Sequence, residues 1–278
     1  MQIKNFSKYL QNLVKKNKPI LAFNVINLET LKAVIKAGEE TKVPLIIQLT
    51  PSAIEYANYD LFIPAVKKAI QNSKAKFALH LDHCQDLKLI KKAIKDGFNS
   101  IMYDGSILPI EENIEFSNKV KKIALNTVLE LEIGKIGGKE ENVVEQNVEI
   151  LDIKDIEFFY QKTKSELLAI AFGTSHGIYK KEANLNFEIL KKFKKKFPHA
   201  ALVMHGTSGL EIQDIQKSIK AGITKINIAT DLLISYTEAF QNFVNKNPKI
   251  YDLRKINNYA IDKTKEKVIF YINNLVLN

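Results

Sequence analysis

The chain has 278 residues, of which 46% are hydrophobic and 26% are charged, a composition typical of a folded globular protein. Its apolar runs are too short for a bilayer span, which needs about 20 residues, and residues 1–18 lack the apolar core of a signal peptide. The single cysteine, Cys84, excludes an intrachain disulfide. We therefore expect a cytoplasmic protein that does not associate with membranes.

The net charge of +10 invites a nucleic-acid-binding interpretation, but the residue type argues against it. All but one of the 41 basic residues are lysines, and they recur at the spacing of solvated helix faces. Proteins that read nucleic acids and phosphates favour the planar fork of arginine. We therefore expect no nucleic-acid partner, and the single arginine, Arg254, becomes a candidate for a specific role.

Short apolar runs alternate with amphipathic segments along the whole chain. The apolar runs predict strands at residues 20–25, 44–49, 77–81, 100–103, 127–133, 167–171, 201–204 and 225–228. The amphipathic segments predict helices at residues 28–40, 61–71, 87–96, 112–124, 153–163, 187–197, 211–221, 231–244 and 259–275.

This rhythm predicts an α/β protein, a (β/α)8 TIM barrel with an additional C-terminal helix, folded as a single domain over residues 1–278. The predicted strands are short, branched and apolar, as strands covered on both faces are. The alternative is an open doubly wound sheet. Its Gly-x-Gly-x-x-Gly turn does not follow the first predicted strand, which favours the barrel.

Polar residues stand where the predicted strands end, and a barrel of this kind carries its active site there. Three of the five histidines, His83, His176 and His205, are among them. Three neutral imidazoles leave the fourth position of Zn²⁺ open, as a catalytic metal requires, and iron or manganese is compatible with the same ligands. The remaining two, His80 in the barrel wall and His199 on a surface turn, are interpreted as residues without a function.

The dipeptide Asp82-His83 ends the third predicted strand. A carboxylate can carry a proton and an imidazole can hold a metal. Neighbouring residues on a strand point to opposite faces, so these two can share a site only where the strand ends and the chain turns.

Two further features predict parts of the site. Glycines at residues 177, 206 and 209 and small hydroxyl residues at 207, 208 and 230 follow the last three predicted strands, which favours a phosphate cradle of exposed backbone N–H groups, although ordinary turns have the same composition. Residues 134–141 are polar and contain three glycines, which predicts a lid that carries a carboxylate into the site. An acidic loop exposed to solvent is the alternative for this segment.

Taken together, these motifs resemble the class II, metal-dependent ketose-bisphosphate aldolases, which include fructose-1,6-bisphosphate and tagatose-1,6-bisphosphate aldolases. The likeness covers about residues 20–258. It is carried by residues 80–83, 103–106, 130–134, 137–138, 173–177, 205–209 and 225–230. Their order, each at the end of a predicted strand, makes the resemblance specific.

The resemblance implies roles for individual residues. One Zn²⁺ per subunit is implied, with His83, His176 and His205 as its ligands. Asp104 and Glu132 are implied as the carboxylates of a secondary metal position. Asp82 is implied as the catalytic acid/base, and Glu140 as the base that takes a proton from bound dihydroxyacetone phosphate. Substrate and phosphate contacts are implied at Asn24, Thr50, Gly177, Lys180, Gly206, Ser208, Asn227, Thr230 and Arg254.

The resemblance also implies partners. The substrate is a sugar bisphosphate, and a monovalent cation, Na⁺ or K⁺, is expected near its phosphate. The chain is expected to form a homodimer or homotetramer, because the arginine that matches Arg254 reaches the second phosphate across a dimer interface. A bidentate fork onto phosphate would explain why this position alone is not lysine.

The implied activity is the reversible cleavage of fructose-1,6-bisphosphate to dihydroxyacetone phosphate and glyceraldehyde-3-phosphate in glycolysis. The sequence departs from the family pattern at three places. Ala229 replaces the Asp or Asn of many fructose-bisphosphate enzymes, Thr50 replaces a common Ser, and residues 139–142 lack the usual Asp-Gly ending. Ala229 is closer to the tagatose-bisphosphate branch, so a tagatose-bisphosphate aldolase or an enzyme of dual specificity is the alternative.

Two hypotheses from other classes also fit parts of the sequence. A TIM-barrel metallohydrolase would use the metal to activate water, and it would need neither the phosphate cradle nor Glu140. A non-enzymatic basic protein that binds polyanions would show strongly salt-dependent binding and would not need His83.

Overall fold

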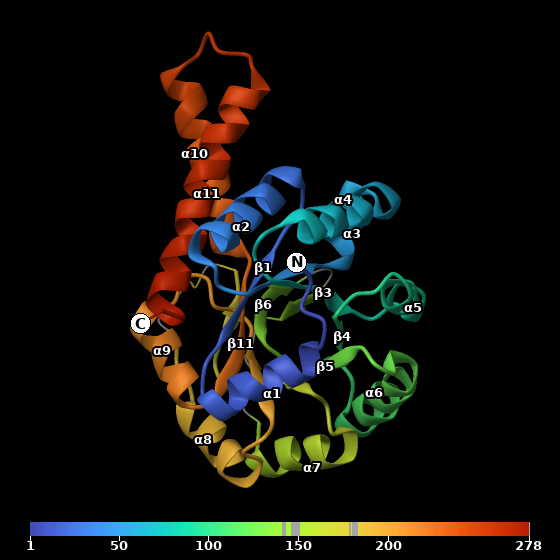
Figure 1. Ribbon diagram of the computed structural model, residues 1–278. Coiled ribbons are helices and arrows are strands. Elements are labelled where there is room, and N and C mark those ends of the chain that lie inside the picture. Colours follow the sequence, from blue (N-terminus) through green and yellow to red (C-terminus); the bar gives the residue numbers. More distant parts are fainter. Residues whose placement is uncertain (141–142, 146–150, 178, 180–182, 278) are drawn as a thin grey trace.

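The computed structural model describes residues 1–140, 143–145, 151–177, 179 and 183–277, with the backbone alone for residues 139–140 and 143–145 (Figure 1). In this part of the chain, eight parallel strands close into a barrel in the order β1-β11-β10-β8-β5-β4-β3-β2. Their bounds are β1 (Ile20–Asn24), β2 (Leu45–Leu49), β3 (Phe77–Cys84), β4 (Ser100–Tyr103), β5 (Val128–Ile133), β8 (Leu167–Ile170), β10 (Ala201–Met204) and β11 (Ile223–Ile228). The predicted TIM barrel is confirmed.

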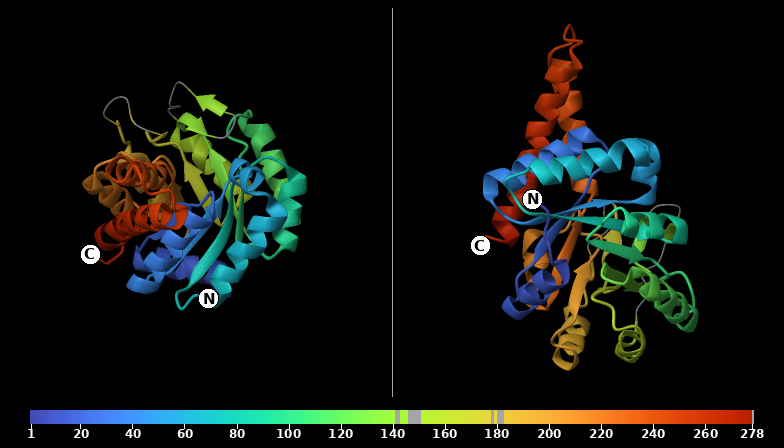
Figure 2. Two further views of the ribbon diagram at one scale, coloured as in Figure 1. Left: turned by 90° about the horizontal axis from the view of Figure 1, so that it is seen from above. Right: turned by 45° about the vertical axis from the view of Figure 1, so that its right-hand side comes forward.

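Helices surround the barrel strands, as the view along the barrel shows (Figure 2). The predicted ones are α2 (Leu28–Thr41), α4 (Tyr59–Asn72), α5 (Leu87–Lys95), α6 (Ile110–Ala124), α7 (Ile153–Thr163), α8 (Phe187–Lys196), α9 (Ile212–Lys220), α10 (Thr230–Lys246) and α11 (Leu253–Leu275). None of these helices is long and apolar enough to cross a membrane, and the same holds for the rest of the described chain.

The barrel interior changes character along its axis. At the N-terminal end it is apolar, because Ile20, Ile46 and Ala78 pack there against Phe6 and Leu10 of α1 (Phe6–Lys16). Further along the strands the buried interior side chains are polar: Asn24, Gln48, His80, Asp82, Glu130, Glu132, Lys225 and Asn227. These positions follow the period of two that places alternate residues on one face of a strand. The site is therefore built on an apolar base.

Two helices were missed by the sequence prediction. The first, α1, begins after the cap residue Asn5, and it closes the bottom of the barrel with only two fully buried side chains in a polar sequence. The second, α3 (Pro51–Ala57), begins with proline at its first position, and the side chain of Thr50 accepts a hydrogen bond from the N–H of Ala53. Both begin with recognisable capping signals.

The segment predicted as a flexible lid is a hairpin in its described part. β6 (Gly137–Glu140) pairs antiparallel with β7 (Val143–Glu145) and parallel with β9 (Ser175–His176). Gly138 lies opposite His176, and a Cβ atom on Gly138 would collide with the carbonyl oxygen of His176. The close approach therefore requires glycine, and it attaches the hairpin to the strand that carries a predicted metal ligand.

Helices α10 and α11 form an arm that projects beyond the barrel (Figures 1 and 2). The two helices pack against each other, and α11 also packs against α2. The connection between them, residues 247–252, lies at the far tip of the arm. α11 begins six residues before the predicted start, because Asp252 caps it by accepting a hydrogen bond from the N–H of Arg254.

Candidate active site

The three predicted metal ligands lie together at the C-terminal end of the barrel. His83 is the penultimate residue of β3, His176 ends β9, and His205 follows β10. Each can offer a ring nitrogen, and these atoms lie within 4.8 Å of one another. His83 Nε2 and His205 Nδ1 lie 2.8 Å apart. Three imidazoles from strands that are far apart in the sequence therefore lie close enough together to bind one metal ion.

The backbone at His83 lets two adjacent residues face the same pocket. His83 has a φ of 43°, in the left-handed region, and the pairing of β3 with β4 shifts register between Leu81 and Cys84. Asp82 and His83 consequently both line the pocket. A left-handed conformation at a residue that is not glycine is costly, and such conformations concentrate at functional sites.

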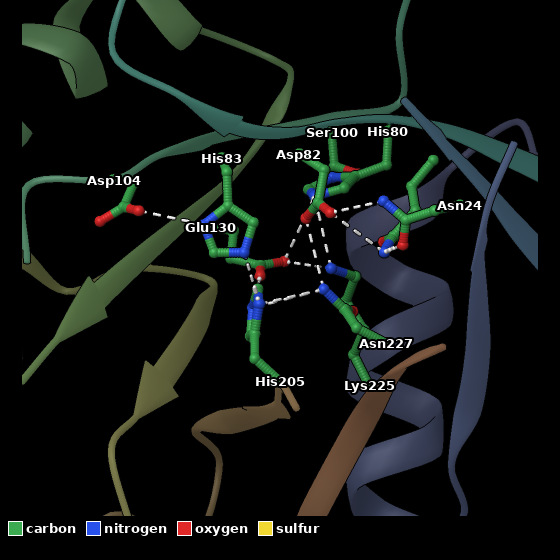
Figure 3. A network of polar contacts seen from close by, with 11 residues as sticks. Asn24, His80, Asp82, His83, Ser100, Asp104, Glu130, His205, Lys225 and Asn227 are labelled. Atoms are coloured by element: carbon green, nitrogen blue, oxygen red, sulfur yellow. Dashed lines mark hydrogen bonds and ion pairs between the residues drawn. The ribbon is translucent and has the colours of Figure 1, made fainter. Parts of the chain in front are cut away.

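The ring of His83 is oriented by a partly buried carboxylate. His83 Nδ1 lies 3.0 Å from Asp104 Oδ2 (Figure 3). Asp104 Oδ1 accepts hydrogen bonds from the N–H and the hydroxyl of Ser106. Burial would raise the pKa of Asp104, but its bonds to His83 and Ser106 hold that pKa below its ordinary value. Since a carboxylate only accepts, the network assigns the proton of His83 to Nδ1 and leaves Nε2 as a ligand.

The ring of His205 is oriented in the same way, by the buried carboxylate of Glu130. Its Nε2 lies 2.9 Å from Glu130 Oε1, and Glu130 Oε2 lies 2.8 Å from Lys225 Nζ. Burial would raise the pKa of Glu130, but Lys225 first and His80 second lower it to about 2. Glu130 is therefore a carboxylate, His205 donates from Nε2, and its Nδ1 lone pair faces His83.

The donor set fits a metal cation. Two lone-pair nitrogens 2.8 Å apart, on His83 and His205, repel each other unless a cation binds them. Burial holds the pKa of His176 well below its ordinary value and lowers that of His205. Neutral imidazoles held by carboxylates on their far side are the ligands that catalytic zinc uses.

A second carboxylate lies beside this group. Glu132 is buried, and it can offer a ligand atom within 4.8 Å of those of His83 and Asp104. Burial, with a contribution from Asp104, raises the pKa of Glu132 well above its ordinary value. Asp104 and Glu132 are therefore placed where a secondary metal position was predicted.

Asp82 is held as a carboxylate by amide groups on β1, β2 and β11. Gln48 donates to its Oδ2 at 3.2 Å. Asn24 also donates to Oδ2, at 3.0 Å, and Asn227 donates to Oδ1 at 3.3 Å (Figure 3). Burial alone would raise the pKa of Asp82, but His83, His80 and Lys225 hold it well below its usual range. A fixed, ionised carboxylate beside the metal group is suited to accept a proton from a substrate hydroxyl.

One pocket collects most of the predicted site residues, together with Thr207 and Ala229. Its lining includes the following predicted residues: Asn24, Asp82, His83, His176, Gly177, His205, Gly206, Ser208, Asn227 and Thr230.

The far side of this pocket has the character of an anion cradle. Gly206 has a φ of 64°, and a Cβ atom there would lie 2.5 Å from the carbonyl oxygen of Ser175. Ser208 Oγ accepts from the N–H of Asp231 at 3.1 Å, at the start of α10. Thr207 Oγ1 is buried without a hydrogen-bond partner in the described part of the chain. A helix N-terminus beside glycines and hydroxyls is a favourable place for phosphate.

Besides Asp104 and Glu132, which lie beside His83, four predicted residues are not placed in the pocket. Thr50 uses its hydroxyl to cap α3, and it does not line the pocket. Arg254 lies in the first turn of α11 at the arm tip, with a side chain 89% exposed and paired with Asp252. Lys180 lies outside the described residues, and so does the side chain of Glu140 at the end of β6.

The sequence analysis missed residues that support the site from inside the barrel. Gln48, Glu130 and Lys225 were given no role, and His80 was interpreted as a wall residue without a function, whereas it lies in the buried network. Alternation on a strand could have found three of them. His80 precedes Asp82 by two residues, Glu130 precedes Glu132 by two, and Lys225 precedes Asn227 by two.

Comparisons with known proteins agree with this geometry. The chain is 35% identical over 267 residues to a sulfofructosephosphate aldolase of Alkalicoccus urumqiensis, covering 93% of each chain. It is 36% identical over 278 residues to a fructose-bisphosphate aldolase of Ureaplasma parvum serovar 3, covering 95% of this chain and 94% of the relative. The crystal structure of the YdjI aldolase from Escherichia coli K12 superposes with a TM-score of 0.85 at 28% identity, over 99% of this chain and 97% of that one.

The match to a family model is equally extensive. The model described as fructose-bisphosphate aldolase class-II matches residues 4–277, which includes the barrel, the pocket and the arm. The sequence resemblance is thereby confirmed and extends beyond residues 20–258. This chain belongs to the class-II fructose-bisphosphate aldolase family, whose members are aldolases of the lyase class.

Proposed function

We propose that this protein catalyses the reversible, metal-dependent cleavage of fructose-1,6-bisphosphate to dihydroxyacetone phosphate and glyceraldehyde-3-phosphate, as a cytoplasmic enzyme of glycolysis. One observation carries the proposal. Asp82, fixed by amides on β1, β2 and β11, lies in the same pocket as the converging His83, His176 and His205. Two of the similar proteins are named fructose-bisphosphate aldolases, which supports the choice of substrate.

The metal is held by His83, His176 and His205, one Zn²⁺ per subunit, with Asp104 and Glu132 in the secondary position. When bound, Zn²⁺ supplies Lewis-acid stabilisation of the negative charge that develops on the substrate during cleavage. The protein supplies neutral ring nitrogens, oriented by Asp104 and Glu130. Zinc is the metal that this donor set and the family favour.

Proton transfer is assigned to two carboxylates. In cleavage, Asp82 takes the proton of the C4 hydroxyl and the C3–C4 bond breaks. The electron pair of that bond stays on C3, in the dihydroxyacetone phosphate half. The aldehyde leaves, and Glu140 returns a proton to C3. In condensation, Glu140 removes that proton and Asp82 protonates the aldehyde oxygen. The pairing of β6 with β9 supports this role, since it attaches the strand of Glu140 to that of His176.

The phosphate of the dihydroxyacetone half is assigned to the cradle described above. Its contacts are proposed at Gly177, Lys180, Gly206, Ser208, Asn227 and Thr230. A monovalent cation, Na⁺ or K⁺, is proposed beside it, where Thr207 Oγ1 and Asn227 Oδ1 are buried oxygens without a hydrogen-bond partner in the described chain. Asn24 and Thr50 are proposed to contact the sugar.

The second phosphate is assigned to Arg254 of a partner subunit in a homodimer, or in a homotetramer built from such dimers. The position of Arg254 on an exposed arm supports this assignment, because the side chain is far from the pocket of its own chain and is accessible to another. A bidentate arginine is a strong phosphate ligand once its partner Asp252 releases it.

A second substrate is favoured by specific observations. Ala229 lines the pocket and offers no side-chain hydrogen bond, which supports tagatose-1,6-bisphosphate or dual specificity as the alternative. A relative of 35% identity is named sulfofructosephosphate aldolase, so a sulfonated sugar phosphate is a further candidate.

The test is a comparison of kcat/KM on these three sugar phosphates, with dihydroxyacetone phosphate as the measured product. We expect fructose-1,6-bisphosphate to have the highest value and EDTA to abolish cleavage. Cleavage that resists EDTA and is trapped by borohydride would indicate Schiff-base chemistry and overturn the proposal. Water-dependent hydrolysis without aldol cleavage would support a metallohydrolase, and salt-sensitive polyanion binding without either activity would support a binding protein.

A further inference from the structure

A second cluster of potential ligands lies inside the barrel, below the three-histidine group. His80, Asp82 and Glu130 can each offer a ligand atom, and these atoms lie within 4.8 Å of one another (Figure 3). All three side chains are buried. Groups of these types together are able to hold a divalent cation.

This second cluster already contains a positive charge from the protein itself. Lys225 Nζ lies 2.8 Å from Glu130 Oε2 and 3.3 Å from His80 Nε2. Lys225 is fully buried, although most lysines of a protein are exposed. Burying an ammonium is unfavourable even when a carboxylate pairs with it, so its presence here calls for a reason beyond stability.

The contacts of Lys225 continue to a proposed metal ligand. Glu130 forms an ion pair with Lys225 through Oε2, at 2.8 Å, and its Oε1 lies 2.9 Å from His205 Nε2. The ion pair restrains the rotation of the carboxylate away from the imidazole. The direction of the His205 ring, and hence of its Nδ1, therefore depends on Lys225.

The same ammonium also fixes the other side of the cluster. It can only donate, so His80 accepts it at Nε2, and His80 Nδ1 then donates to Ser100 Oγ at 2.8 Å. This holds His80 Nε2 at 3.6 Å from Asp82 Oδ1. One buried cation thus contacts Glu130, which supports the metal ligand His205, and His80, whose Nε2 lies beside the acid/base Asp82.

We propose that Lys225 is a positioning residue for the metal centre, which acts as the fixed cation of the His80–Asp82–Glu130 cluster and orients His205 through Glu130. The proposal rests on the metal centre proposed above. The charge of Lys225 lies outside the proposed ligand set, on the opposite side of Glu130 from His205. Lys225 touches neither the metal position nor the pocket lining.

The experiment measures the zinc dissociation constant of the full-length protein by competition with a chelator. In Lys225→Met, which keeps the length of the side chain and removes its charge, we expect zinc to bind about 10–100-fold more weakly. The Co²⁺-substituted variant should show a changed absorption spectrum, which a general loss of stability would not produce. Lys194→Met is the matched control, because Lys194 is also partly buried but donates to the backbone carbonyls of Pro198 and Ala200.

A double variant keeps the test decisive if Lys225→Met does not fold. Lys225→Met/Glu130→Gln removes both members of the Lys225–Glu130 ion pair, and a glutamine oxygen can still accept from His205. We expect it to fold and to bind zinc no more weakly than Lys225→Met, because both changes act through one contact chain. If Lys225→Met folds, a zinc affinity within about twofold of the wild-type value overturns the proposal. If it does not fold, the same result in the double variant overturns it.

His176→Ala separates this inference from the metal centre itself. If His176→Ala loses zinc while Lys225→Met binds it normally, the role of Lys225 is wrong and the metal centre stands. If His176→Ala binds zinc as the wild type does, the metal centre is wrong and the inference falls with it.

Discussion

At the scale of single residues, the ligand types were predictable but their supports were not. Asp82, His83, His176 and His205 could be found because carboxylates and histidines at strand ends are rare enough to notice. The left-handed backbone of His83 could not, because nothing in the sequence marks a strained conformation that tertiary contacts impose. The buried residues that support the candidate ligands can be found only by following each strand inward from the ligand, two residues at a time.

Replacing Asp82 tests the separation of proton transfer from metal binding. Asp82→Ala removes the carboxylate and leaves the three histidines with their carboxylate partners. We expect kcat to fall by about 10²–10⁴-fold, as for the loss of a general acid/base, with zinc content unchanged. Steady-state kinetics together with metal analysis check this. Near-normal turnover in the variant would contradict the assignment.

Stability of the metal-free protein should depend on pH through its buried histidines. The pKa values of His80, His176 and His205 are lowered, first by burial, so these rings stay neutral in the folded state while they gain protons in the unfolded chain below its pKa of about 6.5. The unfolded state then binds more protons, and the free energy of unfolding falls as the pH drops from about 7.5 to about 5.5.

Glu132 opposes this trend and provides the control. Its raised pKa lets the folded state hold a proton that the unfolded chain releases above about pH 4.5, which stabilises the fold as the pH falls. Glu132→Gln should therefore steepen the loss of stability. Urea unfolding of both apo proteins at the two pH values measures it, and a flat profile for the wild type would show that the histidines are not neutral.

At the scale of elements, strands and helices with their own periodic pattern were predicted, and those that depend on distant partners were not. The barrel strands are continuous apolar runs, which can be recognised locally. β9 has two residues and β6 is half glycine, so neither carries a pattern, and only their mutual pairing makes them strands. Residues 134–141 were consequently predicted as a lid, with no strand among them.

The contact between β6 and β9 can be tested at Gly138. Gly138→Ala places a Cβ against the carbonyl of His176 at a φ of 96°, so we expect destabilisation of about 1–3 kcal/mol and weaker zinc binding through the displaced His176. Gly97→Ala is the matched control, because Gly97 has a φ of 80° but no atom within 4 Å of the added Cβ. Thermal unfolding and chelator competition compare them. Equal zinc affinity in both variants would show that the pairing does not position His176.

At the scale of the whole molecule, the β-α rhythm was sufficient to predict the barrel, because only a closed sheet covers eight such units without an exposed edge. The arm was not predicted. Its helices continue past the body of the barrel, and the α10–α11 tip exposes Tyr251 and Leu253. Exposed large side chains on a projecting arm are what an intersubunit contact provides.

Arg254 at the tip of this arm gives the sharpest test of a shared active site. If it completes the pocket of a partner subunit, Arg254→Ala and Asp82→Ala are each inactive on the bisphosphate for different reasons. In a mixed dimer, the pocket of the Arg254→Ala chain has its own Asp82 and receives Arg254 from the other chain. Random re-association makes half of the dimers mixed, so activity should return to about a quarter of the wild-type value.

The outcome depends on geometry alone and not on the size of each single defect. An arginine that served its own chain would give no recovery on mixing, since every chain would carry one of the two lesions. Arg254→Lys should restore only part of the affinity for the second phosphate, because a point charge cannot make the bidentate contact. Full activity of Arg254→Ala alone would remove the arm from the site, and the one arginine of the chain would then be bound to Asp252 as the structure shows it.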